Sequence, residues 1–251
     1  MKEIERLPPP DCLNNDLPET RYEKRRFYKK LRDKRGQIYP RWNSTCKNED
    51  GISRIRLRLL KMSDYCCVYC GKHLENSDMD VDHYLPSGTF PYLAYCWNNL
   101  LASCKYCNQN VKADCAPKSL DGKKIVEAFL ADNYAHDYLY HKTSLLMKIA
   151  GNNRLIEPSF DNPEEHLEFN PEFFFYEAKT NLGQVTISKF FLHKEVAERW
   201  EQTSLFIKKL VVEDTPEEVV LDYISLHGYE YVCLKFYRYW SGEKTAGRIN
   251  R

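Results

Sequence analysis

The sequence contains no apolar run that approaches the ~20 residues needed to cross a lipid bilayer. Its opening stretch, MKEIERLPPPDC, carries charges and lacks the apolar segment that defines a secretory signal. It also shows no internal repeat and no low-complexity segment. These absences argue against membrane-spanning, secreted and repeat proteins. We therefore expect a cytoplasmic protein without a membrane partner, in a compartment where disulfide bonds are rare.

Ten cysteines among 251 residues then need a different explanation. Four of them form two Cys-x-Tyr-Cys pairs, Cys67/Cys70 and Cys104/Cys107. For most of the other six we favour a role as small, buried hydrophobic side chains; they are Cys12, Cys46, Cys66, Cys96, Cys115 and Cys233. The composition, 43% hydrophobic and 29% charged, is typical of a soluble globular chain with one large domain or two small ones.

The net charge of +1 conceals a strong asymmetry. Residues 21–61 hold 15 Lys or Arg residues against four acids, a local net charge of +11, so the rest of the chain sums to −10. A cationic block of this kind suits a phosphate backbone, and a solvated helix face explains it equally well. The candidate nucleic-acid contacts within the block are Arg25, Arg26, Lys29 and Lys30.

Three regions follow from the patterning of the chain. Residues 1–62 form a basic N-terminal segment, with predicted helices over 21–35, ended by Gly36, and over 52–62. Residues 63–118 hold the cysteine pairs, a predicted strand over 79–83 and a predicted short helix over 106–112. Residues 119–251 form a predicted helical region that is rich in aromatic residues. The expected fold class is α+β, mostly helical.

The C-terminal region contains four predicted helices, over 123–130, 143–150, 191–212 and 216–227. The last is expected to begin with Thr215 as its cap and Pro216 in its first turn, and to stop at Gly228. The longest has an expected buried face that consists of Val196, Trp200, Ile207 and Leu210.

The two cysteine pairs predict a metal site. Cys67 and Cys104 are 37 positions apart, and each pair can place two thiolates on one metal from a turn, as in a tetrahedral Cys₄ zinc site. Gly71 suits the tight turn after the first pair. The alternative is four cysteines that are buried by coincidence. Because a closed Cys₄ site leaves no coordination position open, we expect a structural zinc and chemistry elsewhere.

Asp82 and His83 lie between the pairs, on the predicted strand. A histidine can act as a general base, and an adjacent carboxylate can hold a hard cation such as Mg²⁺. Asn99 and Asn108 can orient a histidine or supply a neutral oxygen to a metal. A lone histidine is more often structural, so it is the combination that favours a catalytic site.

Together, the cysteine pairs, Asp82, His83, Asn99 and Asn108 resemble the HNH endonuclease motif with its ββα-metal fold. The resemblance implies that His83 is the general base and that Asp82 and Asn108 hold one catalytic Mg²⁺ or Mn²⁺ ion. It implies that Asn99 fixes a loop and the orientation of His83. The nine-residue step from Asn99 to Asn108 fits the family.

One position departs from the family pattern. Many members carry a lysine three residues after the last motif position, whereas here Val111 stands there and Lys112 follows in fourth place. Lys112 is nevertheless the candidate phosphate contact of the motif.

Longer stretches, within residues 90–101, 153–167 and 186–199, are similar to the HNH component of Septu-type and retron-associated antiphage defence systems. This resemblance implies an effector nuclease that works beside an ABC- or SMC-like ATPase. It also makes the acidic, aromatic C-terminal region the candidate surface for that partner.

Three functions therefore stay open, of which a DNA endonuclease is favoured. An RNase of the same fold, acting for example on tRNA, is possible because such a site attacks a phosphate and does not require a particular sugar. A non-catalytic zinc module that binds nucleic acid or protein is the third, and it leaves Asp82, His83 and Asn108 without a role. The apolar and aromatic stretch over 84–98 either packs beneath the site or marks the defence subfamily.

Overall fold

The computed structural model describes residues 1–14, 29, 40–42, 46–117, 120, 150–190, 194–228 and 230–249. The helices predicted over 21–35 and 123–130 lie outside these ranges, apart from Lys29, as does the one over 143–150 apart from Ala150. Arg25, Arg26 and Lys30 are also outside them, whereas Lys29 is exposed.

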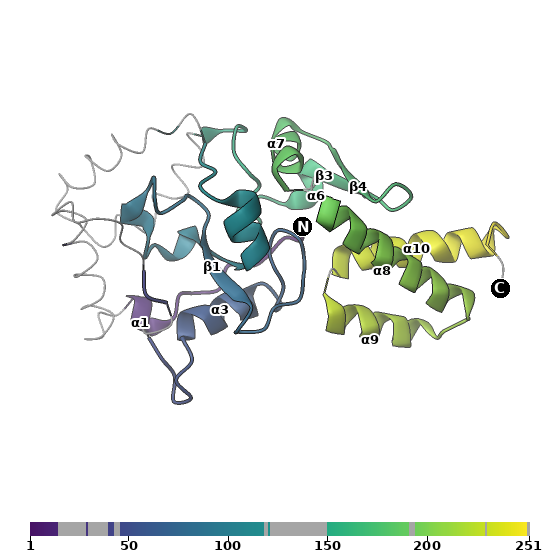
Figure 1. Cartoon of the computed structure of the whole chain (residues 1–251), viewed down its shortest axis with the longest axis horizontal. Coiled ribbons are helices and arrows are strands. Elements are labelled where there is room, and N and C mark those ends of the chain that lie inside the picture. The colour runs from purple at the N-terminus through teal and green to yellow at the C-terminus, as the bar shows by residue number, and fades with distance from the viewer. Residues whose placement is uncertain are drawn as a thin grey trace.

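An antiparallel pair of short strands organises the first half of the molecule. Strand β1 (Met79–His83) pairs with β2 (Leu100–Cys104), in a register that sets Met79 opposite Cys104 and His83 opposite Leu100. Helix η3 (Tyr106–Lys112), a π-helix, follows β2 almost directly. The strand and the short helix predicted from the sequence are thus confirmed at the same boundaries (Figure 1).

Helix α3 (Arg54–Met62) packs against both strands and buries Ile55, Leu59 and Leu60 there. It confirms the helix predicted over 52–62, with a start at Arg54. Two short 3₁₀ helices, η1 (Pro91–Leu93) and η2 (Trp97–Asn99), lie in the connection from β1 to β2. The short helix α1 (Asp11–Asn14) closes the described N-terminal segment.

A β-hairpin stands within the region that was predicted to be helical. Its strands β3 (Leu167–Asn170) and β4 (Phe175–Ala178) follow helix α6 (Pro163–His166) and precede helix α7 (Asn181–Phe190). The sequence Leu-Glu-Phe-Asn of β3 alternates apolar and polar residues, a signal that the sequence interpretation missed, whereas Phe-Tyr-Glu-Ala of β4 does not alternate. Helix α7 contacts both β4 and η3, and so joins the hairpin to the β1–β2 pair.

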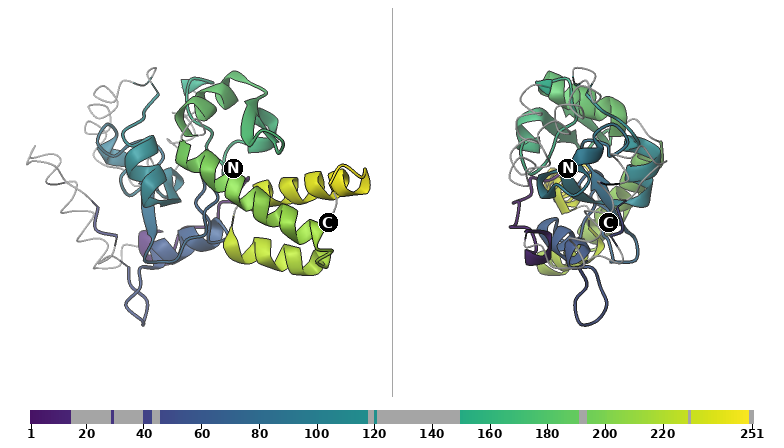
Figure 2. Two further views of the ribbon diagram at one scale, coloured as in Figure 1. Left: turned by 45° about the vertical axis from the view of Figure 1, so that its right-hand side comes forward. Right: turned by 90° about the vertical axis from the view of Figure 1, so that its left-hand side faces the viewer.

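Three helices form the C-terminal end of the described chain: α8 (Lys194–Val212), α9 (Glu217–His227) and α10 (Glu230–Thr245). Helix α10 packs against both α8 and α9 (Figure 2). On the predicted face of α8, Trp200 and Ile207 are buried and Leu210 is half-buried.

Of the two predicted ends of α9, only the C-terminal one is correct. Gly228 ends the helix with a φ of +77°, as predicted. The expectation that Thr215 caps it is wrong, because the capping position is Pro216 and no side chain caps the first turn. Proline has its φ fixed already, so the turn forms without that side-chain bond.

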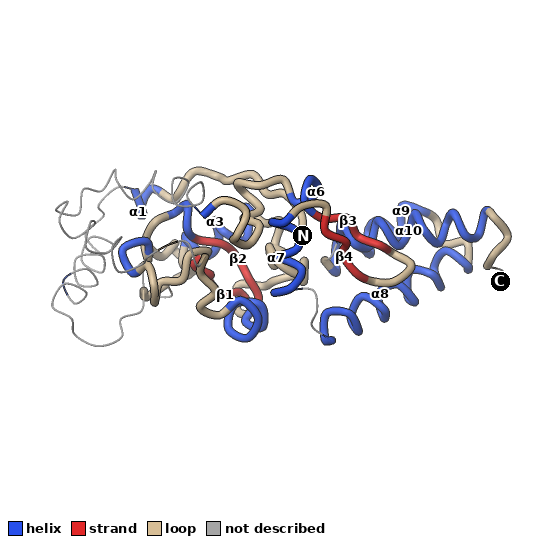
Figure 3. The backbone as a smooth tube through the Cα atoms, turned by 90° about the horizontal axis from the view of Figure 1, so that it is seen from above, coloured by secondary structure: helices blue, strands red, loops and turns tan. Residues whose placement is uncertain are grey.

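The N-terminus lies between the β1–β2 pair and the C-terminal helices (Figure 3). Arg6 donates to the carbonyl oxygens of Trp97 and Leu100, at 2.9 and 3.1 Å, and pairs with buried Glu157 at 2.8 Å. The first residues thus tie the start of β2 to the segment after residue 150. Among the described helices, none is long and apolar enough to span a bilayer.

The cysteines outside the two pairs differ among themselves. Cys96 and Cys233 are buried and form no disulfide bond, as expected, whereas Cys66 and Cys115 form no disulfide bond but are only half-buried. Cys46 is buried and disulfide-bonded, so the expectation of a small hydrophobic side chain is wrong there. A disulfide depends on the approach of distant segments in the fold, which cysteine spacing alone does not reveal.

Candidate functional site

The four paired cysteines converge at one end of the β1–β2 pair. Cys104 is the last residue of β2, and its sulfur accepts the N–H of Cys107 at 3.4 Å. The first pair sits on a tight turn in which Gly71 has a φ of +80° and donates its N–H to the Cys67 carbonyl oxygen at 2.8 Å. That positive φ is the conformation that glycine adopts without strain.

The cysteine cluster fits a tetrahedral zinc ion. Its four sulfurs lie within 4.8 Å of one another, and all four residues are buried. A Zn–S bond of about 2.3 Å gives a tetrahedral edge of about 3.8 Å, and the Cys70 and Cys104 sulfurs are 3.9 Å apart. Hydrogen bonds from the other three thiols lower the pKa of Cys104, whereas burial raises the pKa of Cys67 and the bond to Cys104 raises that of Cys107.

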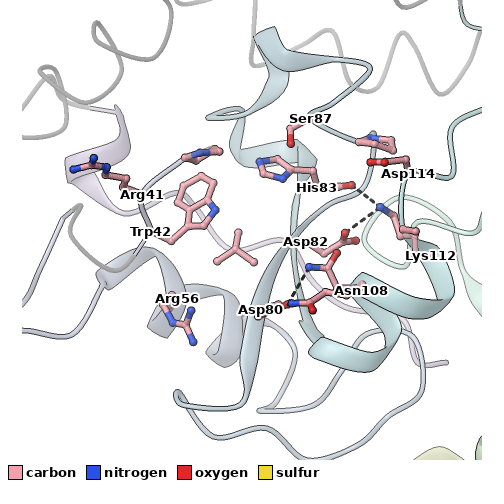
Figure 4. Close-up of a pocket in the computed structure, with 15 residues that line it drawn as sticks. Arg41, Trp42, Arg56, Asp80, Asp82, His83, Ser87, Asn108, Lys112 and Asp114 are labelled. Atoms are coloured by element: carbon pink, nitrogen blue, oxygen red, sulfur yellow. Dashed lines mark hydrogen bonds and ion pairs between the residues drawn. The ribbon is translucent and has the colours of Figure 1, made fainter. Parts of the chain in front are cut away.

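A cavity of about 820 Å³ opens at the other side of the same elements. Asp80, Asp82 and His83 of β1 and Asn108 of η3 line one part of it, and Arg41, Trp42 and Arg56 line another (Figure 4). The cavity thus combines oxygen donors, an imidazole and cationic side chains, which is the mixture that a phosphodiester and a divalent ion require together.

His83 is held in one tautomer. Its Nε2 lies 3.0 Å from the Ala94 carbonyl oxygen, and a carbonyl oxygen only accepts, so Nε2 carries the proton and Nδ1 holds the lone pair. Burial lowers the pKa of His83 below its ordinary value, an effect that nearby Lys112 reinforces and Asp82 opposes. The ring is therefore neutral at pH 7 and has a basic nitrogen available.

Asp82 is almost completely buried, with 1% of its surface exposed. One carboxylate oxygen accepts from the Tyr69 hydroxyl group. The other lies 3.0 Å from the Lys112 ammonium group, which also donates to the His83 carbonyl oxygen at 2.7 Å. Burial raises the pKa of Tyr69, so its hydroxyl stays a donor. These contacts fix the carboxylate and balance its charge in a low-dielectric surrounding.

Asn99 is fully buried and does not line the cavity. Its amide donates to the Leu85 carbonyl oxygen at 3.0 Å and accepts the Leu85 N–H at 2.8 Å. It also donates to the Leu93 carbonyl oxygen at 3.4 Å, next to the Ala94 carbonyl that holds His83. Asn99 thus ties both ends of the loop after β1 together.

The burial of residues 84–98 distinguishes the two explanations given above for this apolar and aromatic stretch. Most of its apolar and aromatic side chains are buried, and so it packs as part of the core; they include Phe90, Leu93, Ala94, Tyr95, Cys96 and Trp97. Leu85 is also completely buried. The packing explanation of this stretch is therefore confirmed.

Asn108 lies on η3 beside β1. Its Nδ2 donates to an Asp80 carboxylate oxygen at 3.2 Å, and the same oxygen accepts from Gln109 Nε2 at 2.7 Å. Asn108 lies between Asp80 and Asp82 in the cavity (Figure 4). The spacing of the motif therefore brings Asp82, His83 and Asn108 to one cavity, as predicted.

Comparisons with known proteins agree with this geometry. The HNH endonuclease family model matches residues 67–114. This segment is an HNH domain. The chain is also 52% identical over 60 residues to the Septu protein PtuB of Bacillus thuringiensis, a match that covers 23% of this chain and 23% of that protein. The matched stretch is thus about a quarter of each protein. No solved structure matches the chain.

Within the HNH domain, one predicted residue, Lys112, stands differently from expectation. Lys112 lines the cavity but is only 1% exposed and is paired with Asp82. Asn99 bonds the backbone of the loop after β1, which agrees with the loop-fixing contact that the family resemblance implied. The expected α+β fold with a cysteine cluster is confirmed.

The sequence interpretation missed several side chains that line the cavity or bond to its residues. Asp80 could have been found, since residues two apart on a strand share a face and Asp82 was already a candidate. Tyr69, which bonds Asp82, gave no such signal, because it lies between two cysteines of the cluster. Trp42 and Arg56 come from segments before the motif, and only the tertiary fold brings them to the cavity.

Proposed function

We propose that the chain is a metal-dependent HNH endonuclease that hydrolyses phosphodiester bonds of DNA. One observation carries the proposal above all: the Nε2–H of His83 is bonded to Ala94, so Nδ1 is a free base, in a cavity that Asp82 and Asn108 share. A non-catalytic zinc module gives no reason for that arrangement.

His83 acts as the general base. With Nε2 protonated and held at 3.0 Å by the Ala94 carbonyl, Nδ1 takes a proton from the attacking water. The lowered pKa of His83 keeps the ring in its basic, neutral form at physiological pH. Asn99 is a positioning residue, because it holds the loop that carries Ala94.

Asp82 and Asn108 hold one Mg²⁺ or Mn²⁺ ion. A carboxylate and an amide oxygen are hard donors that such ions prefer. When bound, the ion supplies Lewis-acid polarisation of a phosphoryl oxygen and stabilises the leaving oxygen. The side chains themselves present the donors, and Tyr69 keeps the Asp82 carboxylate in place. The four cysteines hold a separate zinc ion that maintains the fold.

Lys112 contributes to the site through its ion pair with the Asp82 carboxylate. Its ammonium group lies 3.0 Å from the Asp82 carboxylate and 2.7 Å from the His83 carbonyl oxygen. A direct phosphate contact requires this buried group to leave both partners. We therefore assign Lys112 the role of holding the Asp82 carboxylate and the His83 carbonyl group in place. Contact with a phosphate is a secondary role.

The proposed substrate is supported by the charge of residues 21–61, and the proposed partner by the similarity to PtuB. The local charge of +11 in residues 21–61 suits a polyanionic backbone, with Arg25, Arg26, Lys29 and Lys30 as the contacts. The 52% identity over 60 residues to the Septu protein PtuB supports a place in antiphage defence. An ATPase partner and a cytoplasmic location belong to the same proposal, through the resemblance to Septu-type systems. Charge reversal at those four residues is expected to weaken binding and flatten its salt dependence.

The decisive test is plasmid cleavage in Mg²⁺ or Mn²⁺ by the wild type and His83→Ala, with and without the partner ATPase. Loss of the base is expected to reduce the rate by about 10²- to 10⁴-fold. His166→Ala is the matched control, since His166 is another half-buried histidine and its ring bonds Thr180 at 2.9 Å. Equal cleavage by the wild type and His83→Ala contradicts the proposal.

Total RNA, tRNA included, is incubated in parallel. Cleavage of RNA with intact plasmid identifies an RNase of the same fold in place of a DNase.

A further inference from the structure

Asp80 receives two amide hydrogen bonds at the edge of the cavity. Asn108 Nδ2 and Gln109 Nε2 both donate to the same carboxylate oxygen, at 3.2 and 2.7 Å. Asp80 is half-buried in β1, where its backbone pairs with Ser103. Neither the sequence motif nor the proposed reaction gives this carboxylate a role.

The chemistry of the carboxylate dictates how the Asn108 amide is turned. An ionised carboxylate only accepts hydrogen bonds, so the NH₂ end of Asn108 must face Asp80. The amide is planar, with its oxygen on the other side from that NH₂ group. Asp80 and Asp82 share one face of β1, and Asn108 lies between them (Figure 4). The Asn108 oxygen is thereby directed away from Asp80, towards the Asp82 side of the cavity.

We infer that Asp80 is a positioning residue that orients Asn108, so that its amide oxygen meets the divalent ion held with Asp82. The inference rests on the proposed function. Without the carboxylate, a half-turn of the amide presents its NH₂ group to the cation, which repels it. Gln109 supports the arrangement, because its own bond to the same oxygen holds the Asp80 carboxylate against η3.

Mn²⁺ affinity of the zinc-loaded full chain, measured by calorimetry without substrate, tests this inference. Asp80→Asn is nearly isosteric and is expected to weaken Mn²⁺ binding by about 10- to 100-fold, the usual effect of removing a group that orients a metal ligand. Asp78→Asn is the matched control, since Asp78 is an exposed acid two residues earlier and its loss removes the same charge. It is expected to change the affinity by less than about twofold.

A double-mutant cycle separates orientation from simple charge. If Asp80 acts through Asn108, the Asp80→Asn change has no further effect on Mn²⁺ affinity in an Asn108→Ala background. If the loss persists there, Asp80 attracts or binds the ion itself and the inference is wrong. An Asp80→Asn protein with wild-type Mn²⁺ affinity also overturns it.

Folding and the proposed function are checked separately. Zinc content and thermal melting report whether each variant is intact, and Asp80→Ser is the second variant, because its hydroxyl accepts or donates and so no longer dictates the amide orientation. A wild type that binds Mn²⁺ and cuts, beside an unaffected Asp80→Asn, refutes the inference alone. A wild type that binds no Mn²⁺ and shows no His83-dependent cleavage refutes the proposed function.

Discussion

The β1–β2 pair carries a cysteine cluster at one end and the cavity with His83 at the other. Cys104 faces Met79 in the register and His83 faces Leu100, four residues away, which is about 13 Å along a strand. At the cluster the donors face one another and are buried. At the cavity they face about 820 Å³ of open space.

This contrast separates two uses of a metal. Four mutually facing thiols leave no position for a substrate, so a zinc ion there contributes only folding free energy. Asp82 and Asn108 supply just two donors, and the cavity leaves room for water and phosphate oxygens. The difference predicts that changes at the cluster affect stability and activity together, whereas changes at the cavity affect activity first.

The largest effect is expected at the cysteine cluster. Cys104→Ser removes one thiol of the proposed zinc site at the end of β2, and we expect loss of zinc and a destabilisation of several kcal/mol, because metal binding and folding are coupled in such sites. The measurements are metal content and thermal melting by circular dichroism. Cys115→Ser is the control, as Cys115 is a half-buried cysteine outside the cluster. Unchanged melting of a zinc-free Cys104→Ser protein would disprove a structural role.

A smaller effect on stability and a large one on activity are expected from Asn99→Ala. The change leaves the Leu85 N–H and carbonyl groups without their buried partner, at a cost of about 2 kcal/mol. Because the loop also holds Ala94 against His83, we expect kcat to fall by about tenfold or more, with little change in KM. Asn110→Ala, at an exposed amide of η3, serves as control. A purely structural role would lower the melting temperature and leave the kcat of the folded fraction intact.

The pH dependence of the cleavage rate tests the role of His83 at the cavity. Burial lowers the pKa of His83, so its basic form persists down to a pH below the ordinary value of about 6.5. The cleavage rate is expected to stay flat around neutrality and to fall tenfold per pH unit below that pKa. Single-turnover rates at saturating Mn²⁺, with melting curves in the same buffers, provide the measurement. A rate that keeps rising above neutral pH contradicts a neutral His83 as the base.

The sequence was sufficient where local signals decide the structure. The β-branched centre of the short stretch 79–83 predicted β1, and the exit of the chain from the second cysteine pair predicted η3 over 106–112. The spacing of the motif brought Asp82, His83 and Asn108 together. It was insufficient where contacts join distant segments. Lys112 meets Asp82 across 30 positions, and Arg6 meets Glu157 across 151, and neither pair follows from periodicity.

Tyr69 links the two ends of the β1–β2 pair. It lies between Cys67 and Cys70 of the cysteine cluster, donates to Asp82, and stacks on Phe190 of α7 with ring centroids 4.4 Å apart. Tyr69→Phe removes only the hydroxyl group and keeps the stacked ring. The loss of one hydrogen bond is worth about 1 kcal/mol, and Lys112 still holds the carboxylate, so we expect Mn²⁺ affinity to fall only about fivefold.

The same change in the second pair, Tyr106→Phe, is the control for this smallest effect, and both variants are compared by calorimetry, zinc content and melting. Weaker Mn²⁺ binding with unchanged zinc and melting means that the cysteine cluster supports the cavity through the Asp82 bond. Parallel losses of Mn²⁺ affinity and melting temperature mean that Tyr69 acts through packing instead. In that case the two ends depend on one another only because they share the same strands.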